Sequence, residues 1–175
     1  MPLPKDYSGQ NCAIARSLEV VGERWTLLIV RDLFYGVRHY NDLRRHLAIP
    51  PAVLRDRLNH LVEEGVVQRT AGPGAYHQYT LTKAGVDLWP VVWSLLAWGE
   101  RHRSSGTKRI FIHALCGRPL HRTGQCSTCQ TFPAVKDIIT QLPPRSVKRP
   151  PDADDAPLDK VAATLREPHR LLSPI

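Results

Sequence analysis

The segment from 39 to 81 constrains the fold most, because two adjacent prolines and a glycine-rich stretch divide it into short elements. Residues 40–47 place apolar side chains at helical spacing, which predicts a first short helix. Pro50 restricts the backbone before it, and Pro51 suits the first position of a second helix over 51–64. Two short helices joined by a tight turn are therefore expected.

The second of these helices has two contrasting faces. Leu54, Leu58 and Leu61 fall on one stripe when successive residues are placed about 100° apart, so this stripe is expected to face the core. The opposite face carries short polar groups, with arginines on its flanks. A helix of this kind can be anchored by one face while the other reads base edges in a DNA groove.

A hairpin follows the second helix directly. Residues 66–70 and 78–81 have the composition of strands, and the glycine-rich segment 71–75 joins them. Two short helices and then a hairpin form the order of a winged helix-turn-helix. The predicted fold class is thus mainly α with a small β-hairpin wing.

The candidate DNA-binding residues lie on the outer face of helix 51–64, on the flanking helix or on the wing. Asn59 is suited to an adenine edge, Asp56 to a cytosine amine and Val53 to a thymine methyl. The arginines are suited to guanine edges or phosphates, and the flanking cations to phosphate positioning. Taken singly, each residue is equally well explained as part of a solvated surface. The full set is Arg38, Arg44, Arg45, Ala52, Val53, Arg55, Asp56, Arg57, Asn59, Arg69 and His77.

Apolar helices are predicted on both sides of this segment, over 11–21, 23–35 and 82–103, with a kink of the last at Pro90. The helix 82–103 is apolar on nearly every side, and one small domain cannot cover it all round. The simplest partner for the remaining face is a second copy of the chain. A homodimer is therefore expected.

The order and identity of many residues over 11–103 resemble the HxlR-type transcriptional regulators, which are related in fold to the MarR group. The resemblance implies a homodimeric winged-helix DNA-binding protein that dimerises through the terminal helices of the domain and recognises DNA with helix 51–64. A repressor acting on a palindromic operator is the expected function. The residues that carry the resemblance are Cys12, Gly22, Arg24-Trp25-Thr26-Leu27-Leu28-Ile29, Arg31-Asp32-Leu33, Leu43-Arg44, Leu54, Arg57-Leu58, Leu61, Gly65, Tyr79, Leu81-Thr82, Gly85 and Trp98-Gly99.

Cys12 stands where several members of that family carry a cysteine that senses electrophiles or oxidants. A thiol at a helix N-terminus gains thiolate character from the backbone dipole. Cys12 is accordingly a redox-sensing candidate, and the alternative is a small buried side chain. A small-molecule effector is a further hypothesis for the control of DNA binding.

A group of candidate metal ligands lies outside this domain. His113, Cys116, Cys126 and Cys129 form the pattern H-x2-C-x9-C-x2-C. Two short-spaced pairs that close on one ion are typical of tetrahedral structural zinc, and His121 is a rival ligand. A redox pair of Cys126 and Cys129, or unligated thiols, are the alternatives. The sequence therefore predicts a small zinc-knuckle-like appendage.

The net charge of +8 favours a polyanionic partner, but it is unevenly distributed. Residues 1–103 hold 13 Lys and Arg against 10 Asp and Glu, whereas residues 104–150 hold 8 against 1. The excess therefore lies mainly outside the predicted helix-turn-helix, where it either adds phosphate contacts or belongs to a solvated linker.

The predicted organisation is a DNA-binding and dimerisation domain over 8–103, a cysteine-containing extension over 104–142 and a mostly disordered tail over 143–175. With no signal peptide and no apolar run near the roughly 20 residues that span a bilayer, a cytoplasmic protein without membrane contact is expected. Two other functional classes stay open. One is a zinc- or thiol-dependent oxidoreductase, and the other is a protein-interaction module scaffolded on the winged helix.

Overall fold

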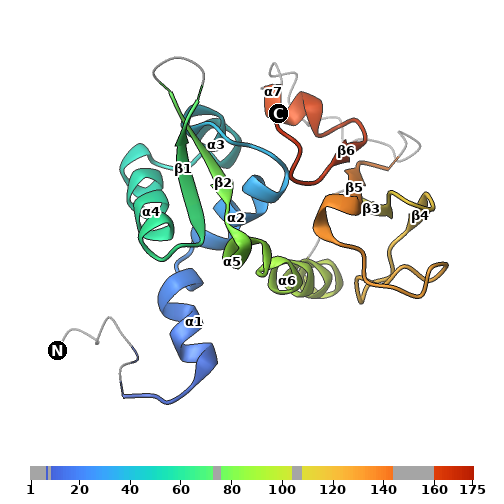
Figure 1. The fold of residues 1–175 in the computed structure, drawn as a ribbon, viewed down its shortest axis with the longest axis horizontal. Coiled ribbons are helices and arrows are strands. Elements are labelled where there is room, and N and C mark those ends of the chain that lie inside the picture. Colours follow the sequence, from blue (N-terminus) through green and yellow to red (C-terminus); the bar gives the residue numbers. More distant parts are fainter. Residues whose placement is uncertain (1–6, 8, 73–75, 104–107, 144–159) are drawn as a thin grey trace.

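The computed structural model describes residues 7, 9–72, 76–103, 108–143 and 160–175 (Figure 1). It contains a two-stranded sheet, β1-β2, and a four-stranded sheet of order β4-β3-β5-β6. The elements in chain order are α1 (Ala13–Val21), α2 (Thr26–Phe34), α3 (Tyr40–Leu47), α4 (Pro51–Glu63), β1 (Val67–Ala71), β2 (His77–Leu81), α5 (Lys83–Val86), α6 (Trp89–His102), β3 (Ile110–His113), β4 (Arg118–Pro119), η1 (Val135–Asp137), β5 (Ile138–Gln141), α7 (Lys160–Thr164) and β6 (His169–Arg170).

The helices α2, α3 and α4 enclose one apolar core. The inward stripe of α4 is Leu54, Leu58 and Leu61, and none of these side chains is more than 1% exposed. Leu43 of α3 and Phe34 of α2 are fully buried in the same cluster. The helix-turn-helix expected from the leucine spacing is thus present, with α4 as its second helix.

The turn between α3 and α4 depends on two local features. Ala48 adopts a left-handed conformation with φ of +49°, which reverses the chain after α3. Tyr40 Oη donates a hydrogen bond to the carbonyl of Pro51 over 2.7 Å, and this bond links the starts of the two helices. Pro51 occupies the first turn of α4, as the sequence predicted.

The hairpin of β1 and β2 is antiparallel, and its register runs from Val67 opposite Leu81 to Ala71 opposite His77. The middle of the predicted glycine-rich loop, 73–75, lies outside the described residues. Thr82 ends the hairpin and caps α5, because its Oγ1 accepts a hydrogen bond from Gly85 N over 3.2 Å. The mainly α fold with a small β-hairpin wing is confirmed.

The single kinked helix predicted over 82–103 is wrong. The chain forms two helices, α5 and α6, separated at Asp87 and Leu88, and Pro90 lies in the first turn of α6. Proline has no N–H to donate, and the first turn of a helix is the one place where none is needed. The chain therefore starts a new helix at Trp89, with Pro90 in its first turn, where the sequence predicted a bend in an existing helix.

The expectation of a mostly disordered tail is corrected for residues 160–175, which we call the C-terminal strap. The strap contains α7 and β6, and its side chains Val161, Leu165 and Leu171 are each 1% exposed. The sequence does not indicate which surface buries these apolar residues, so their shared burial site is visible only in three dimensions. Residues 144–159 of the predicted tail lie outside the described residues.

α1 stands away from the body of the molecule, beside the N-terminus (Figure 1). Its Ile14 is 71% exposed and its Leu18 is 45% exposed. Among the described residues, no helix combines the length and apolar character needed to cross a membrane.

Candidate DNA interface and metal centre

The outer face of α4 is open to solvent beside the hairpin (Figure 1). Ala52, Arg55 and Asn59 are exposed on this face, and Val53 is half-buried at its edge. These residues lie opposite the buried leucine stripe, so the core fixes the helix while the outer face stays accessible. The structure places them together as the sequence predicted, and their contact with DNA remains a proposal.

Arg57 differs from the other arginine of α4 in having carboxylate partners. Its guanidinium lies 3.8 Å from Glu23 and pairs with Asp56, and its side chain is only 20% exposed. The hydrogen bond from Arg57 lowers the pKa of the Asp56 carboxyl. Arg55 is thus the exposed cation of α4, whereas Arg57 is tied to the turn before α2.

Cations flank α4 on both neighbouring elements. Arg44 and Arg45 are exposed on α3, and Arg45 lies 3.8 Å from Asp42. Arg69 and His77 are exposed on β1 and β2. A polyanion that contacts α4 therefore meets positive charge from the helix before it and from the wing.

Arg38 is placed differently from the other candidate cations. It is half-buried between α2 and α3, and its Nη2 donates a hydrogen bond to the carbonyl of Leu172 in the strap over 2.9 Å. A residue assigned to a phosphate contact from the sequence is thus engaged with the strap. A short helix over 158–166 was expected from the sequence, and α7 lies within it, but no contact of this segment with the helix-turn-helix was predicted.

A buried carboxylate that joins α2 to α3 was also missed by the sequence reasoning. Asp32 is fully buried, and its Oδ1 accepts hydrogen bonds from Arg31 Nε at 2.9 Å and Nη2 at 2.7 Å. Its Oδ2 lies 2.6 Å from Nδ1 of His46 on α3. A buried carboxylate needs such partners, so this group fixes the first helix of the helix-turn-helix against its scaffold. Only the Arg31-Asp32 pair hinted at it in the sequence.

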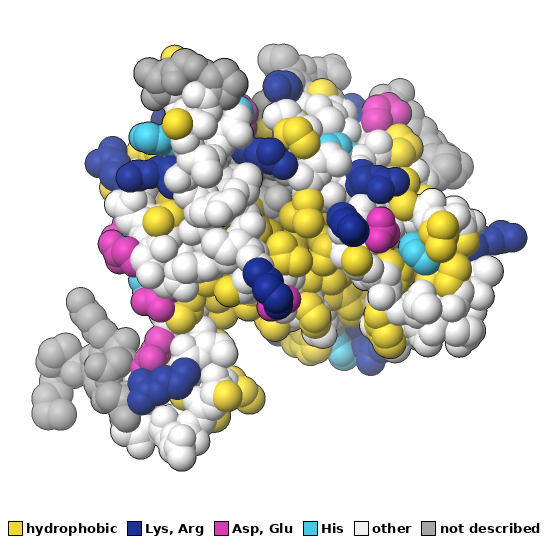
Figure 2. Space-filling view, in the orientation of Figure 1, with side chains coloured by type: hydrophobic (Ala, Val, Ile, Leu, Met, Phe, Trp, Pro, Cys, Tyr) yellow, Lys and Arg dark blue, Asp and Glu magenta, His cyan; other side chains and the backbone are white. Residues whose placement is uncertain are grey.

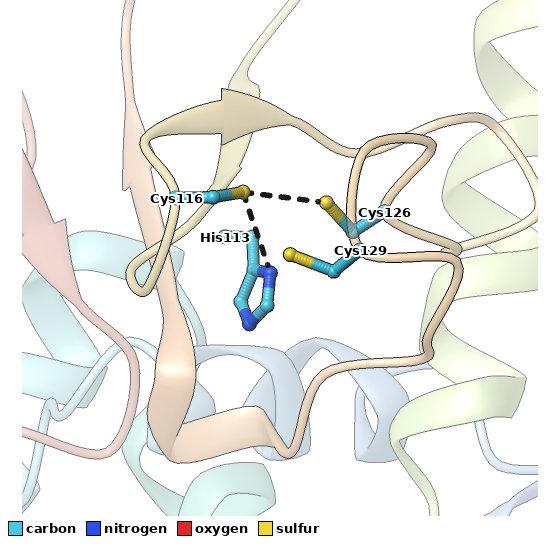
Figure 3. Close-up of side chains that lie close together, drawn as sticks. All are labelled: His113, Cys116, Cys126 and Cys129. Atoms are coloured by element: carbon cyan, nitrogen blue, oxygen red, sulfur yellow. Dashed lines mark hydrogen bonds between the residues drawn. The ribbon is translucent and has the colours of Figure 1, made fainter.

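The four predicted metal ligands converge (Figure 3). The ligand atoms of His113, Cys116, Cys126 and Cys129 all lie within 4.8 Å of one another. Cys116 Sγ is 3.4 Å from Cys126 Sγ and 3.6 Å from His113 Nδ1. Two sulfurs on a tetrahedral zinc ion with bonds of about 2.3 Å stand about 3.8 Å apart, so the cluster has the dimensions of such a site.

Local backbone geometry creates the cluster. His113 ends β3, and the turn that follows returns Gly117 N to the carbonyl of His113 over 2.8 Å, with Gly117 at a φ of +68°. A second turn joins Gln130 N to the carbonyl of Cys126 over 2.8 Å. Each turn brings two ligands to one side, as the short spacings of the sequence require.

The thiols of this cluster have divergent acidities. The backbone hydrogen bond from Cys129, opposed by burial, lowers the pKa of Cys126 to about 6. The hydrogen bond with Cys116 and burial raise the pKa of Cys129 to about 11. One thiolate is therefore favoured, and a second beside it requires a cation, which a divalent metal ion supplies.

Two other candidates lie apart from the cluster. His121 is exposed, and its Nδ1 lies 3.0 Å from Thr123 Oγ1, so the rival ligand is not part of the four-residue group. Cys12 is an exposed thiol at the N-cap position of α1, and it is not part of the four-residue group. The alternative of a small buried side chain at Cys12 does not hold in the described chain.

An apolar surface extends across the middle of the molecule (Figure 2). A hollow of about 250 Å³ lies between α2, α6 and β3, and its walls include Leu28, Trp89 and Phe111. One stripe of α6 is also exposed, with Leu95 49% exposed and Trp98 54% exposed.

Known proteins share this architecture. The model of the HxlR-like helix-turn-helix family matches residues 20–107. An HTH-type transcriptional regulator of Mycobacterium tuberculosis strain H37Rv is 40% identical over 127 residues, which are 70% of this chain and 79% of that protein. The regulator YybR of Bacillus subtilis is 30% identical over 101 residues, which are 54% of this chain and 78% of YybR. The crystal structure of PA1607, described as a transcription factor, superimposes with a TM-score of 0.62 at 31% identity and covers 66% of this chain and 84% of its own.

Proposed function

Because the chain belongs to the HxlR-like helix-turn-helix family, as its sequence resemblance predicted, we propose that it is a homodimeric repressor of a palindromic DNA operator. The family assignment makes it a transcriptional regulator of the helix-turn-helix type. The observation that carries the finer proposal is the exposed outer face of α4, together with the exposed cations of α3 and of the β1-β2 hairpin.

In this proposal α4 enters the major groove. Asn59 and Arg55 read base edges from the exposed face of α4, and the half-buried Val53 adds an apolar contact from the edge of that face. Arg44, Arg45, Arg69 and His77 contact phosphates and set the register of the protein on the duplex. Contacts from Ala52 and Asp56 complete the reading face. Arg38 and Arg57 contribute indirectly, through the partners that hold them.

The dimer forms through α1 and α6. The exposed Ile14 and Leu18 of α1 and the exposed Leu95 and Trp98 of α6 are apolar stripes that the described part of one chain leaves uncovered. A second copy related by a twofold axis covers both stripes at once. Two α4 helices related by the same axis require an operator with twofold symmetry.

The four-residue cluster holds a structural zinc ion. Three thiols and one imidazole within 4.8 Å match the ligand set of structural zinc sites, and four protein ligands leave no position for a substrate. The ion supplies folding energy to a four-stranded sheet whose strands are only two to four residues long. The proposal therefore assigns the cluster no catalytic role.

In this proposal the protein is cytoplasmic, and an oxidant, an electrophile or a small molecule controls its binding to DNA. The exposed Cys12 is accessible to an oxidant or electrophile, and it directly precedes α1, one of the helices assigned to the dimer. The apolar hollow between α2, α6 and β3 is the place where a small uncharged molecule fits.

The test is retention of genomic DNA fragments by the purified dimer at stepped salt concentrations. We expect selective retention of one or a few fragments and an affinity that falls steeply with salt, because phosphate contacts release counterions. Retention of no duplex above background at low salt would contradict the proposal.

A further inference from the structure

The strap packs against the helix-turn-helix at the junction between α2 and α3. Its Leu172 N donates to the carbonyl of Phe34 over 2.7 Å, and its Ile175 N donates to the carbonyl of Gly36 over 3.1 Å. A Cβ at Gly36 would lie 1.6 Å from the carbonyl oxygen of Ser173, so the strap approaches a bare backbone. Position 36 therefore accepts only glycine while the strap is in place.

The same junction supports the DNA-binding elements. Arg38 Nη2 donates to the strap carbonyl of Leu172, while the carbonyl of Arg38 accepts a 2.9 Å hydrogen bond from Tyr79 N of β2. α7 of the strap packs on α3, and its Val161 and the adjacent Leu165 are buried. The strap thus contacts the first helix of the helix-turn-helix and the segment that supports the wing.

The other side of the strap is part of the metal-bearing sheet. β6 pairs with β5, with His169 opposite Thr140, and Leu171 N donates to the carbonyl of Ile138 over 2.9 Å. β5 in turn pairs with β3, where Ile138 lies opposite the ligand His113. One strand separates a metal ligand from the strap.

We propose that metal occupancy of the four-residue cluster keeps the strap on the helix-turn-helix and thereby raises the affinity for DNA. This inference rests on the proposed function and names its regulation. A structural metal ion stabilises a small sheet with short strands, and β6 has β5 as its sheet neighbour. When the metal leaves, β5 loses its fixed partner β3, and the strap separates from Phe34, Gly36 and Arg38. α3 and the wing then lose a support on which the orientation of α4 depends.

The test compares the full chain loaded with zinc, stripped by a chelator and reloaded with zinc. Hydrogen exchange is measured at the amides of Leu172 and Ile175, with those of Val66 and Thr82, which are hydrogen-bonded inside the DNA-binding domain, as internal reference. Affinity is measured for the fragment that the dimer retains. Stripping is expected to speed exchange of the two strap amides about tenfold or more, to leave the reference amides nearly unchanged and to weaken DNA binding by about tenfold.

A chain ending at Leu171 separates the strap from the metal. It keeps the four ligands and β6 but lacks both amides that donate to the junction. It should bind zinc as the full chain does, bind DNA weakly and show no response of DNA affinity to zinc. Arg118→Ala, on the exposed β4, is the control, and zinc should change its DNA affinity as much as it changes that of the unaltered chain.

Three results would overturn the inference: strap amides that stay protected without metal, a shortened chain whose DNA affinity still responds to zinc, and a chain that binds no zinc. If the zinc-loaded chain retains no DNA, the proposed function fails and the effect on affinity fails with it. Faster exchange of the strap amides on stripping would even then support the link between metal and strap.

Discussion

Replacing Trp98 by alanine tests the dimer through its largest exposed apolar side chain on α6. Trp98 is 54% exposed in the single chain. A tryptophan side chain has roughly 200 Å² of surface, so roughly 110 Å² is available for burial in each protomer. At about 25 cal/mol per Å², this burial is worth about 3 kcal/mol per protomer and about twice that in a symmetric dimer.

Association does not recover the whole of this free energy, because ordering side chains at the interface opposes it. If half of the burial free energy of the two Trp98 side chains contributes to association, Trp98→Ala weakens the dimer by about 3 kcal/mol. This free energy corresponds to a dissociation constant roughly 100-fold higher. Sedimentation equilibrium over a range of protein concentrations measures that constant directly.

Phe132→Ala is the matched control. Phe132 is 69% exposed and belongs to the extension, so its removal deletes a comparable aromatic surface without touching α6. Its dimer constant should equal that of the unaltered chain. If Trp98→Ala and Phe132→Ala dimerise equally tightly, the interface does not use this stripe of α6 and the reasoning is refuted.

Further substitutions test base reading, phosphate contact, metal binding and strap packing separately. Asn59→Ala should weaken binding to the retained fragment by about 1–3 kcal/mol with an unchanged salt slope, whereas Arg44→Ala should lower that slope by about one. Equal salt slopes in the two variants would contradict the phosphate contact assigned to Arg44. Cys126→Ser should abolish stoichiometric zinc and lower the melting temperature, as judged by metal analysis and calorimetry, and a variant that melts like the parent would exclude a structural ion. Gly36→Ala should destabilise the chain by at least about 2 kcal/mol more than Gly65→Ala, because the strap lies within 1.6 Å of the added Cβ at Gly36 and nothing lies within 4 Å of the one at Gly65. Both glycines have positive φ, so similar melting temperatures would show that the strap is not packed there.

Much of the DNA-binding domain followed from local chemistry. The spacing of Leu54, Leu58 and Leu61 predicted the buried face of α4, and Pro51 predicted its start. These signals are readable because a helix repeats every 3.6 residues and because proline fixes one dihedral angle. The break before Pro90 was not foreseen, since a proline inside an apolar run is compatible with a kink or with a new first turn. Tertiary packing decides between them.

The candidate site was predictable to different degrees. The short spacings around Cys116 and Cys129 allowed each pair of ligands to be predicted locally, and the meeting of the two pairs followed from the known geometry of zinc. The pairing of Arg57 with Glu23 joins residues that are distant in the sequence, and a surface charge carries no mark of its partner.

The sequence by itself determined the helix-turn-helix, the wing and the four-residue cluster, because each depends on the spacing of a few nearby residues. Only the tertiary structure decided which group binds Arg38 and where the C-terminal strap packs. Leu171 and Leu172 are adjacent in the sequence, and no helical or strand periodicity indicates which surface buries each of them. Their place against Phe34 and Ile138 arises from contacts across more than 30 residues of chain, for which a sequence pattern contains no local signal.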